Sequence, residues 1–419
     1  MRKNTRKNYD PPVPPVKKIE VDDKHRKPKL VLIVILLALG VTLIVTSIVG
    51  LLKTEPGWTT IQANVTSEES CSGDFQFQYY LGAGDRPANL EQRELTQLYS
   101  DATKTVFEIF HEDQLFNGVN NVCYLNQHVN EVVQVPKVLY DAFALLEEHG
   151  TRALFAAPLY WEYIGLCLSD QDAVAETYDP DKDALQQEYF AEVLAFTNDE
   201  AAVSLQLMGD NQVKLCVSDE YLEYAQTHEI TEFISFYWLK NAFIADYLAE
   251  TLIAAGYTNG IISSFDGFSR NLDVSAQNYR MNLFDRVGDE VYVAGALEYS
   301  GATAFVSLHS YPMSELAVQQ YYTWKDGSVT SCYIDPADGR DKTAVNDLLG
   351  YSKNFGCAEV LLELIPAYVA ESLDVQALET AETRGVHSIY CEGRKIYCSN
   401  AVAVLVDIYS DSAVTYEKG

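Results

Sequence analysis

The sequence has 419 residues, with 60 Asp and Glu against 30 Lys and Arg, so its formal net charge is -30 at pH 7. Hydrophobic residues make up 48% of the chain, which is enough for a core and excludes disorder over most of the length. Because phosphate recognition needs a basic face, the acidic balance also excludes a typical nucleic-acid-binding protein.

The first 52 residues predict a membrane anchor. Residues 1–29 hold ten Lys and Arg but only four acids, and the proline-rich stretch at 10–15 indicates a disordered basic tail. Residues 30–52 contain no charged residue and no proline. At 1.5 Å per residue this segment spans roughly 34 Å, enough for one transmembrane helix. A cleaved signal peptide is the alternative, although no small-x-small cleavage site follows Leu52.

The distribution of charge around this segment predicts its orientation. Because the basic residues precede the span, the positive-inside rule places the N-terminus in the cytoplasm and the C-terminal domain outside the cell. We therefore expect a single-pass protein of the cell membrane. The remaining chain carries 56 acids and 20 bases, a net charge of -36. Such a surface repels anionic lipid and nucleic acid.

Residues 53–72 are polar and lack periodicity, so we expect an extracellular stalk there. Beyond it, the hydrophobic pattern predicts helices at 89–111, 136–148, 184–196, 236–255, 314–321, 356–370 and 375–383. It predicts strands at 74–80, 202–208, 212–217, 258–264, 278–284, 290–297, 303–308, 328–334, 388–391 and 396–398. Long helices between hairpins, with no repeat and no second linker, favour one α+β domain of antiparallel sheets packed with helices over residues 73–419.

Eight cysteines follow the predicted span, but they form no CxxC pair and no metal-binding spacing. Cys391 and Cys398 flank a predicted hairpin turn. A disulfide across that hairpin and a pair of buried free thiols are both compatible with the pattern.

Common catalytic and phosphate-binding motifs are absent. The sequence contains no GxGxxG, no GxxxxGK[ST], no HExxH and no GxSxG. Its seven histidines occur singly. We therefore assign no catalytic residue from these patterns.

Several short motifs nevertheless occur in a definite order. They are ALFA at 153–156, NAFIAD at 241–246, SFD at 264–266, CYIDPADG at 332–339 and AEVLLE at 358–363. In order and spacing this chain resembles the FAD:protein FMN transferases, the ApbE family, over nearly the whole predicted domain. The resemblance implies an exported, membrane-linked α+β protein that uses magnesium to cleave FAD and attach FMN to a threonine of a partner flavoprotein.

The resemblance also implies a set of site residues. Those implied for cofactor binding are Asp246, Asp266, Asp335 and Gly339, and those implied for metal binding are Ala358, Glu359 and Glu363. The sequence departs from the family pattern at several of its positions. Asn241 replaces a lysine, Ser264 and Phe265 replace glycines, Cys332 replaces a histidine, and Glu359 and Glu363 replace an aspartate and a threonine.

These replacements have physical consequences. Glycines let the backbone approach a pyrophosphate, and the side chains of Ser264, Phe265 and Asn241 would crowd it. Phe265 is compatible with stacking on a flavin or with a buried strand position. Magnesium needs near-octahedral oxygen ligands at about 2.0–2.1 Å. Glu359 and Glu363 share one helix face, so they either bind a cation together or are two solvated acids.

The segment 300–303, with the sequence SGAT, is similar to the acceptor motif to which FMN is attached, with Thr303 as the acceptor. A hairpin turn followed by a strand of small residues is the alternative.

Three functions therefore compete. The first is a divergent magnesium-dependent FMN transferase, and the second is a non-catalytic module that binds flavin or a partner protein on the same fold. The third is an unrelated extracellular interaction domain. The acidic surface and the lost glycines and histidine favour the second over the first.

Overall fold

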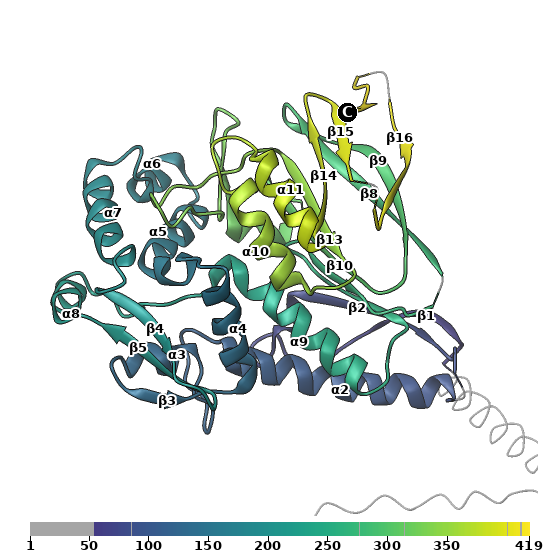
Figure 1. The fold of residues 1–419 in the computed structure, drawn as a ribbon, viewed down its shortest axis with the longest axis horizontal. Coiled ribbons are helices and arrows are strands. Elements are labelled where there is room, and N and C mark those ends of the chain that lie inside the picture. Colours follow the sequence, from purple (N-terminus) through teal and green to yellow (C-terminus); the bar gives the residue numbers. More distant parts are fainter. Residues whose placement is uncertain (1–53, 85, 276, 314, 400, 411–412) are drawn as a thin grey trace, which may run out of the picture. The chain divides into compact units, whose positions relative to one another are not determined.

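A nine-stranded sheet forms the centre of the part of the chain that the computed structural model describes, residues 54–419 apart from 85, 276, 314, 400 and 411–412 (Figure 1). Its order is β1 (Gly57–Ile61), β2 (Phe75–Leu81), β6 (Gly260–Ser264), β7 (Phe268–Asn271), β10 (Thr303–His309), β13 (Asp347–Ser352), β14 (His387–Glu392), β15 (Lys395–Cys398) and β17 (Glu417–Lys418). Neighbouring strands are antiparallel except β15 and β17, which are parallel.

Side-chain alternation explains why β2 forms where it does. Phe75, Phe77, Tyr79 and Leu81 are buried, and the residues between them are exposed. This period of two places every apolar residue of the strand on one face of the sheet. The structure confirms the strand predicted at 74–80.

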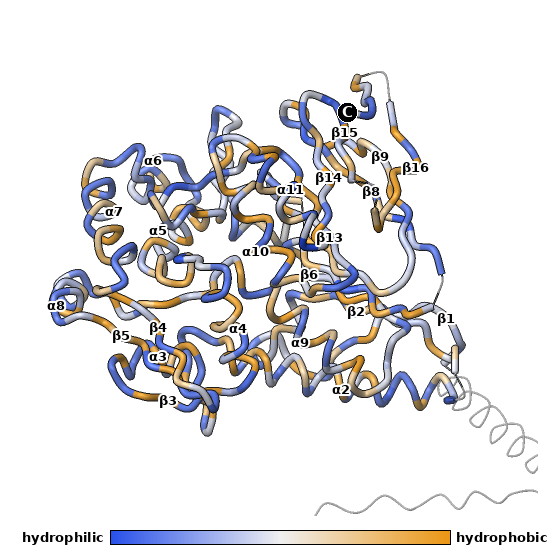
Figure 2. Tube along the Cα trace, in the orientation of Figure 1, coloured by the Kyte–Doolittle hydropathy of each residue, from blue (hydrophilic) through white to orange (hydrophobic). Residues whose placement is uncertain are grey.

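Four long helices pack along this sheet and on one another: α2 (Ala88–Phe110), α9 (Lys240–Ala254), α10 (Cys357–Tyr368) and α11 (Val375–Arg384). Hydrophobic and hydrophilic residues alternate along α2 (Figure 2), as expected for a helix with one buried face. The helix α9 contacts β6 and β7, and α10 contacts β10 and β13. Gly350 in β13 permits this close approach, because a Cβ there would collide with Leu364 of α10.

A second, smaller sheet consists of β8 (Asn278–Val287), β9 (Glu290–Ser300) and β16 (Val404–Ile408), in the order β16-β9-β8. It shares a separate hydrophobic core with β10, β13, β14 and β15. Leu348 belongs to the main core, whereas Leu349 belongs to this second core. The strand β13 is therefore covered on both faces, and all six of its residues are buried.

The remaining helices are α3 (Val122–Gln127), α4 (Lys137–Glu148), α5 (Ala157–Cys167), α6 (Asp172–Ala175), α7 (Ala184–Thr197) and α8 (Asp219–Thr227). Short 3₁₀ helices occur at η1 (Cys71–Gly73), η2 (Ala153–Ala156), η3 (Glu176–Tyr178), η4 (Tyr237–Leu239) and η5 (Glu315–Gln320). Two small sheets complete the fold: β3 (Val132–Gln134), β5 (Gln212–Val217) and β4 (Val203–Leu207), and the pair β11 (Tyr321–Thr323) and β12 (Val329–Ser331).

The structure confirms an α+β arrangement of helices and sheets and corrects several predicted elements. Residues 57–61, expected within a stalk, form the edge strand β1. The segment has no periodicity of its own, and pairing with β2 supplies hydrogen-bond partners for its backbone. The helix expected at 314–321 is the 3₁₀ helix η5, followed by β11. The sequence pattern missed α5 and β13, which are mostly buried and so lack the alternation that marks an amphipathic element.

The disulfide considered between Cys391 and Cys398 is not present, and both are free thiols. In the hairpin, Cys391 lies opposite Ile396 and Cys398 lies opposite Ile389. The two cysteines are thus two positions out of register, and the alternative of free thiols holds.

Within residues 54–419, as far as they are described, no helix combines the length and the hydropathy that crossing a membrane requires. The predicted basic tail at 1–29 and the predicted span at 30–52 lie outside the described residues.

Candidate functional site

A pocket of about 520 Å³ lies where the start of α9, the end of β6 and the helix α5 come together. Lys240 and Asn241 are the first two residues of α9, and Phe265 and Asp266 directly follow β6. The pocket therefore joins residues from two of the sequence motifs. Its other lining residues are Gly73, Asp74, Glu112, Asp113, Ala157, Tyr160, Trp161, Ile164, Leu168, Glu232, Ser235, Tyr237, Ala317, Gln319 and Gln320.

A hydrogen bond connects the two motifs inside the pocket. The Asn241 side-chain amide donates to Oδ2 of Asp266 at 2.9 Å, and the Gln320 amide donates to the same oxygen at 3.4 Å. Burial raises the pKa of Asp266, although these donors act against the shift. The Oδ1 atoms of Asp266 and Asn241 are buried, and neither has a hydrogen-bond partner among the described residues. Two acceptors thus remain for a donor that a ligand would supply.

Two exposed aromatic rings border the same pocket. Phe265 is 42% exposed and Trp161 is 47% exposed. The Trp161 indole donates its Nε1–H to Glu232 at 2.9 Å, which orients the ring. Phe265 is therefore not the buried strand residue that was one of its two predicted alternatives. The structure leaves its ring available for stacking.

The pocket is strongly acidic. Five carboxylates line it, those of Asp74, Glu112, Asp113, Glu232 and Asp266, and among its described lining residues Lys240 alone is basic. Burial raises the pKa of Glu232 to about 8; the nearby Glu112 and Asp113 act in the same direction, while the Trp161 hydrogen bond opposes it. Of these residues, the sequence analysis had named Asp266. It missed Asp74, Glu112, Asp113, Glu232 and Trp161, because they are single residues in loops and in an unpredicted helix.

Asp246, expected to bind a cofactor, does not line this pocket. Its carboxylate accepts hydrogen bonds from the backbone amides of Cys357 at 2.7 Å and Ala358 at 2.9 Å, at the start of α10. It also forms an ion pair with Arg270 of β7. Asp246 therefore caps one helix and anchors it to the sheet, which is a structural role.

Asp335 and Gly339, also expected to bind a cofactor, lie in one turn outside the pocket. The Gly339 amide donates to the Asp335 carbonyl at 2.8 Å, and Lys342 pairs with the Asp335 carboxylate at 2.8 Å. Gly339 has a φ of +73°, and Tyr163 donates its hydroxyl to the Gly339 carbonyl at 3.1 Å. These contacts give Asp335 and Gly339, which belong to the CYIDPADG motif, a role in stabilising the turn.

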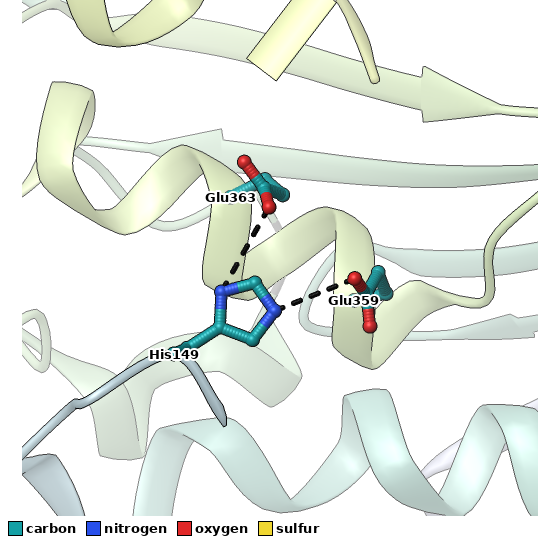
Figure 3. Close-up of side chains that lie close together, drawn as sticks. All are labelled: His149, Glu359 and Glu363. Atoms are coloured by element: carbon teal, nitrogen blue, oxygen red, sulfur yellow. Dashed lines mark ion pairs between the residues drawn. The ribbon is translucent and has the colours of Figure 1, made fainter. Parts of the chain in front are cut away.

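Glu359 and Glu363 share one face of α10, as expected, and both point toward His149 (Figure 3). His149 is the C-cap residue that directly follows α4. Its Nε2 lies 3.4 Å from Glu359 Oε1, and its Nδ1 lies 3.9 Å from Glu363 Oε1. Arg384 also pairs with Glu363 Oε1, at 2.6 Å. Ala358, the third residue expected at the metal, is buried, and its amide bonds to Asp246.

Solved structures of flavin transferases have the same fold. The ApbE protein from Thermotoga maritima matches with a TM-score of 0.53 and 12% identity over 75% of this chain and 90% of that chain. The flavin transferase ApbE from Vibrio cholerae matches with a TM-score of 0.51 and 13% identity over 84% of this chain and 98% of that chain.

The fold is that of the ApbE flavin transferases. The family resemblance indicated by the order of the sequence motifs is thus confirmed at the level of the fold. No protein-family model and no curated protein matches the sequence.

The donor set on α10 does not fit the magnesium that the ApbE fold implies. Magnesium prefers oxygen ligands in octahedral geometry and keeps several waters. Here the two nitrogens of the His149 ring face two different glutamates, and the Arg384 guanidinium already occupies Glu363. The two glutamates are therefore not freely solvated acids. With His149 they place ligand atoms within 4.8 Å of one another, a mixed nitrogen and oxygen set instead of the oxygen set that magnesium prefers. The Arg384 guanidinium supplies positive charge at Glu363, where a metal ion would have to bind.

The pocket likewise does not fit the pyrophosphate of FAD. A pyrophosphate needs cationic or backbone N–H donors, whereas this pocket offers five carboxylates and one lysine. Phe265 occupies a position where the family pattern has glycine and where backbone would approach the phosphates. The aromatic borders and the two unpartnered acceptors do suit a flat ring with N–H groups.

The segment 300–303 is the turn between β9, which ends at Ser300, and β10, which begins at Thr303. The two strands belong to different sheets, so this turn does not close a hairpin. Thr303 is 2% exposed, and its hydroxyl donates to the Gly301 carbonyl at 3.1 Å. A hydroxyl in this position cannot be reached for flavin attachment. Of the alternative, the turn followed by a strand is confirmed, whereas the hairpin pairing is not.

Proposed function

We propose that this domain binds a flavin through its ring system and does not transfer FMN. The observation that carries the proposal is the pair of exposed rings, Trp161 and Phe265, at the pocket where the two motifs meet. The fold supports the choice of flavin, because solved proteins with this fold include a flavin transferase.

The polar groups of the pocket suit the edge of a flavin ring. The isoalloxazine ring carries an N–H donor, and the ribityl chain carries hydroxyl donors. These groups would satisfy the buried Oδ1 atoms of Asp266 and Asn241, which have no described protein partner. Stacking on Trp161 or Phe265 would add about 0.5–1.5 kcal/mol beyond the burial of apolar area.

Loss of transfer is supported by the residues that the family pattern would use. Asp246 is committed to the cap of α10 and to Arg270. Glu359 lies 3.4 Å from the His149 ring, and Glu363 is paired with Arg384. A domain without a fitting metal site and without the cationic donors that a pyrophosphate needs would retain flavin without cleaving FAD.

The cellular setting belongs to the same proposal. The basic residues 1–29 and the uncharged segment 30–52 support a single-pass membrane protein with the flavin-binding domain outside the cell. An extracellular flavoprotein or another flavin-using protein would be its partner. Labelling of a C-terminal tag in intact cells tests the orientation, and a tag that reacts only after permeabilisation would contradict it.

The central test uses the full-length chain in mild detergent, incubated with riboflavin or with FAD and Mg²⁺ and then desalted. We expect a flavin spectrum to remain with the protein after incubation with riboflavin, and we expect the intact mass to be unchanged after either incubation. Trp161→Leu should remove the colour, whereas Trp58→Leu, at an exposed tryptophan of β1, should not. A colourless wild-type protein would contradict flavin binding. Covalent transfer of FMN to an added acceptor flavoprotein would contradict the loss of activity.

A further inference from the structure

The charges of the pocket are arranged in two groups. Glu112 is fixed by the protein, because its carboxylate accepts hydrogen bonds from the Ser235 hydroxyl and the Phe236 amide, each at 2.7 Å. Asp74 and Asp113 are exposed residues at the pocket. A ligand in this pocket therefore meets negative charge both at its buried wall and at its exposed side.

The single lysine does not balance these acids. Lys240 has no carboxylate within ion-pair distance among the described residues, and it shares the pocket with five acidic residues. Burial raises the pKa of Glu232 to about 8, so at neutral pH the negative charge comes from the other acids. The unpartnered buried atoms, Oδ1 of Asp266 and Oδ1 of Asn241, are both acceptors. Charge and hydrogen bonding thus make the same demand, for a ligand that donates hydrogen bonds and carries no negative charge.

Flavins differ in the group at the end of the ribityl chain. Riboflavin ends in an uncharged hydroxyl, FMN ends in a phosphate, and FAD continues through a pyrophosphate. A phosphate monoester carries about -1.5 to -2 charges at neutral pH and only accepts hydrogen bonds from the protein. In this pocket such a group would meet carboxylates instead of donors.

Building on the flavin binding proposed above, we propose that the pocket selects uncharged flavin, riboflavin, and discriminates against FMN and FAD. The selection arises because the carboxylates and the unpartnered acceptors repel a phosphate. It does not require a specific contact with the terminal hydroxyl of riboflavin. Riboflavin should therefore bind at least about tenfold more tightly than FMN at low salt, since one multiply charged group is placed among several like charges.

The test is a titration of the full-length chain with riboflavin, FMN and FAD, in which binding is measured by the quenching of flavin fluorescence. The titrations are made at about 50 mM and about 500 mM NaCl, because screening weakens repulsion between exposed charges. We expect riboflavin affinity to be nearly independent of salt and FMN affinity to rise with salt. This comparison uses the wild-type chain alone and does not depend on the folding of any variant.

A charge variant locates the discrimination in the pocket. Asp74→Asn/Asp113→Asn removes two exposed carboxylates of the pocket and should tighten FMN binding several-fold while riboflavin binding changes little. The control variant Asp101→Asn/Asp141→Asn removes the same number of charges from exposed positions on α2 and α4. It should leave the ratio of riboflavin affinity to FMN affinity unchanged.

The possible results separate the two proposals. Binding of FMN or FAD as tight as riboflavin, or an unchanged ratio in the pocket variant, would overturn the selection while flavin binding itself would stand. Failure of all three flavins to bind would overturn the proposed function and the selection together.

Discussion

The side-chain amide of Asn241 lies 2.9 Å from the carboxylate of Asp266 and donates a hydrogen bond to it. This bond joins the first turn of α9 to the residues that follow β6. Asn241 stands where the family pattern has lysine, so a neutral donor replaces a cation beside a carboxylate whose pKa is raised by burial. The pair lines the candidate flavin pocket, and the effect of removing this hydrogen bond on stability should be measurable.

Asn241→Ala would leave Asp266 Oδ2 with only the longer Gln320 contact at 3.4 Å. We expect the free energy of unfolding to fall by about 1–3 kcal/mol, the usual cost of depriving a buried polar group of its partner. Urea unfolding measures this change. Asn278→Ala, at an exposed residue of β8, is the control and should have an effect below about 0.5 kcal/mol. Equal effects of the two substitutions would contradict a role for the bond.

Asp246→Ala should destabilise the domain strongly. The substitution removes the cap of α10 and leaves Arg270, with a side-chain exposure of 13%, without its Asp246 partner. We expect a loss of about 3 kcal/mol or more. Asp374→Ala removes only a cap, that of α11, and should cost about 1 kcal/mol. Asp246→Asn should fall between the two because asparagine still caps the helix, and a loss no larger than that of Asp374→Ala would exclude a combined role.

Glu232 should make stability depend on pH. Burial raises its pKa from 4.5 to about 8 in the folded chain, so the folded state binds more protons than the unfolded state between these values. Its contribution to stability therefore decreases as pH rises through this window and levels off above it. Glu232→Gln should reduce the slope of unfolding free energy between about pH 5 and pH 8. Glu379→Gln, at an exposed residue of α11, should leave the slope unchanged.

Magnesium should not stabilise this protein. A site with a Kd of about 0.1 mM would raise the free energy of unfolding by ~2.7 kcal/mol at 10 mM metal, and we expect no such shift in Tm. His149→Ala leaves the paired glutamates without the ring between them and should lower Tm by itself. A magnesium-dependent rise in the wild-type Tm that His149→Ala or Glu363→Gln abolishes would show that the cluster does bind the metal.

The elements that the pattern predicted well are those with an amphipathic period. The alternation at 75–81 and the helical spacing along α2 indicate one buried face each, and both elements form as expected. Elements without such a period were missed. β13 is buried on both faces, and β1 is an edge strand whose pairing partner decides its structure. Hydrophobic periodicity reflects the difference between a solvent-exposed face and a buried face, so it cannot detect an element that lacks this difference.

The order of the short motifs was sufficient to indicate the ApbE fold, because the motifs mark turns and helix starts that occur in a fixed order along the chain in this fold. It also brought Asn241, Phe265 and Asp266 to attention, and these do share one pocket. What each motif residue does was decided by tertiary structure. Asp246 caps α10, a helix that begins more than a hundred residues later, and Glu359 and Glu363 meet His149 from α4. The acids and the tryptophan that complete the pocket come from separate loops and helices. Charge, burial and partner depend on through-space neighbours, and a linear motif describes only neighbours along the chain.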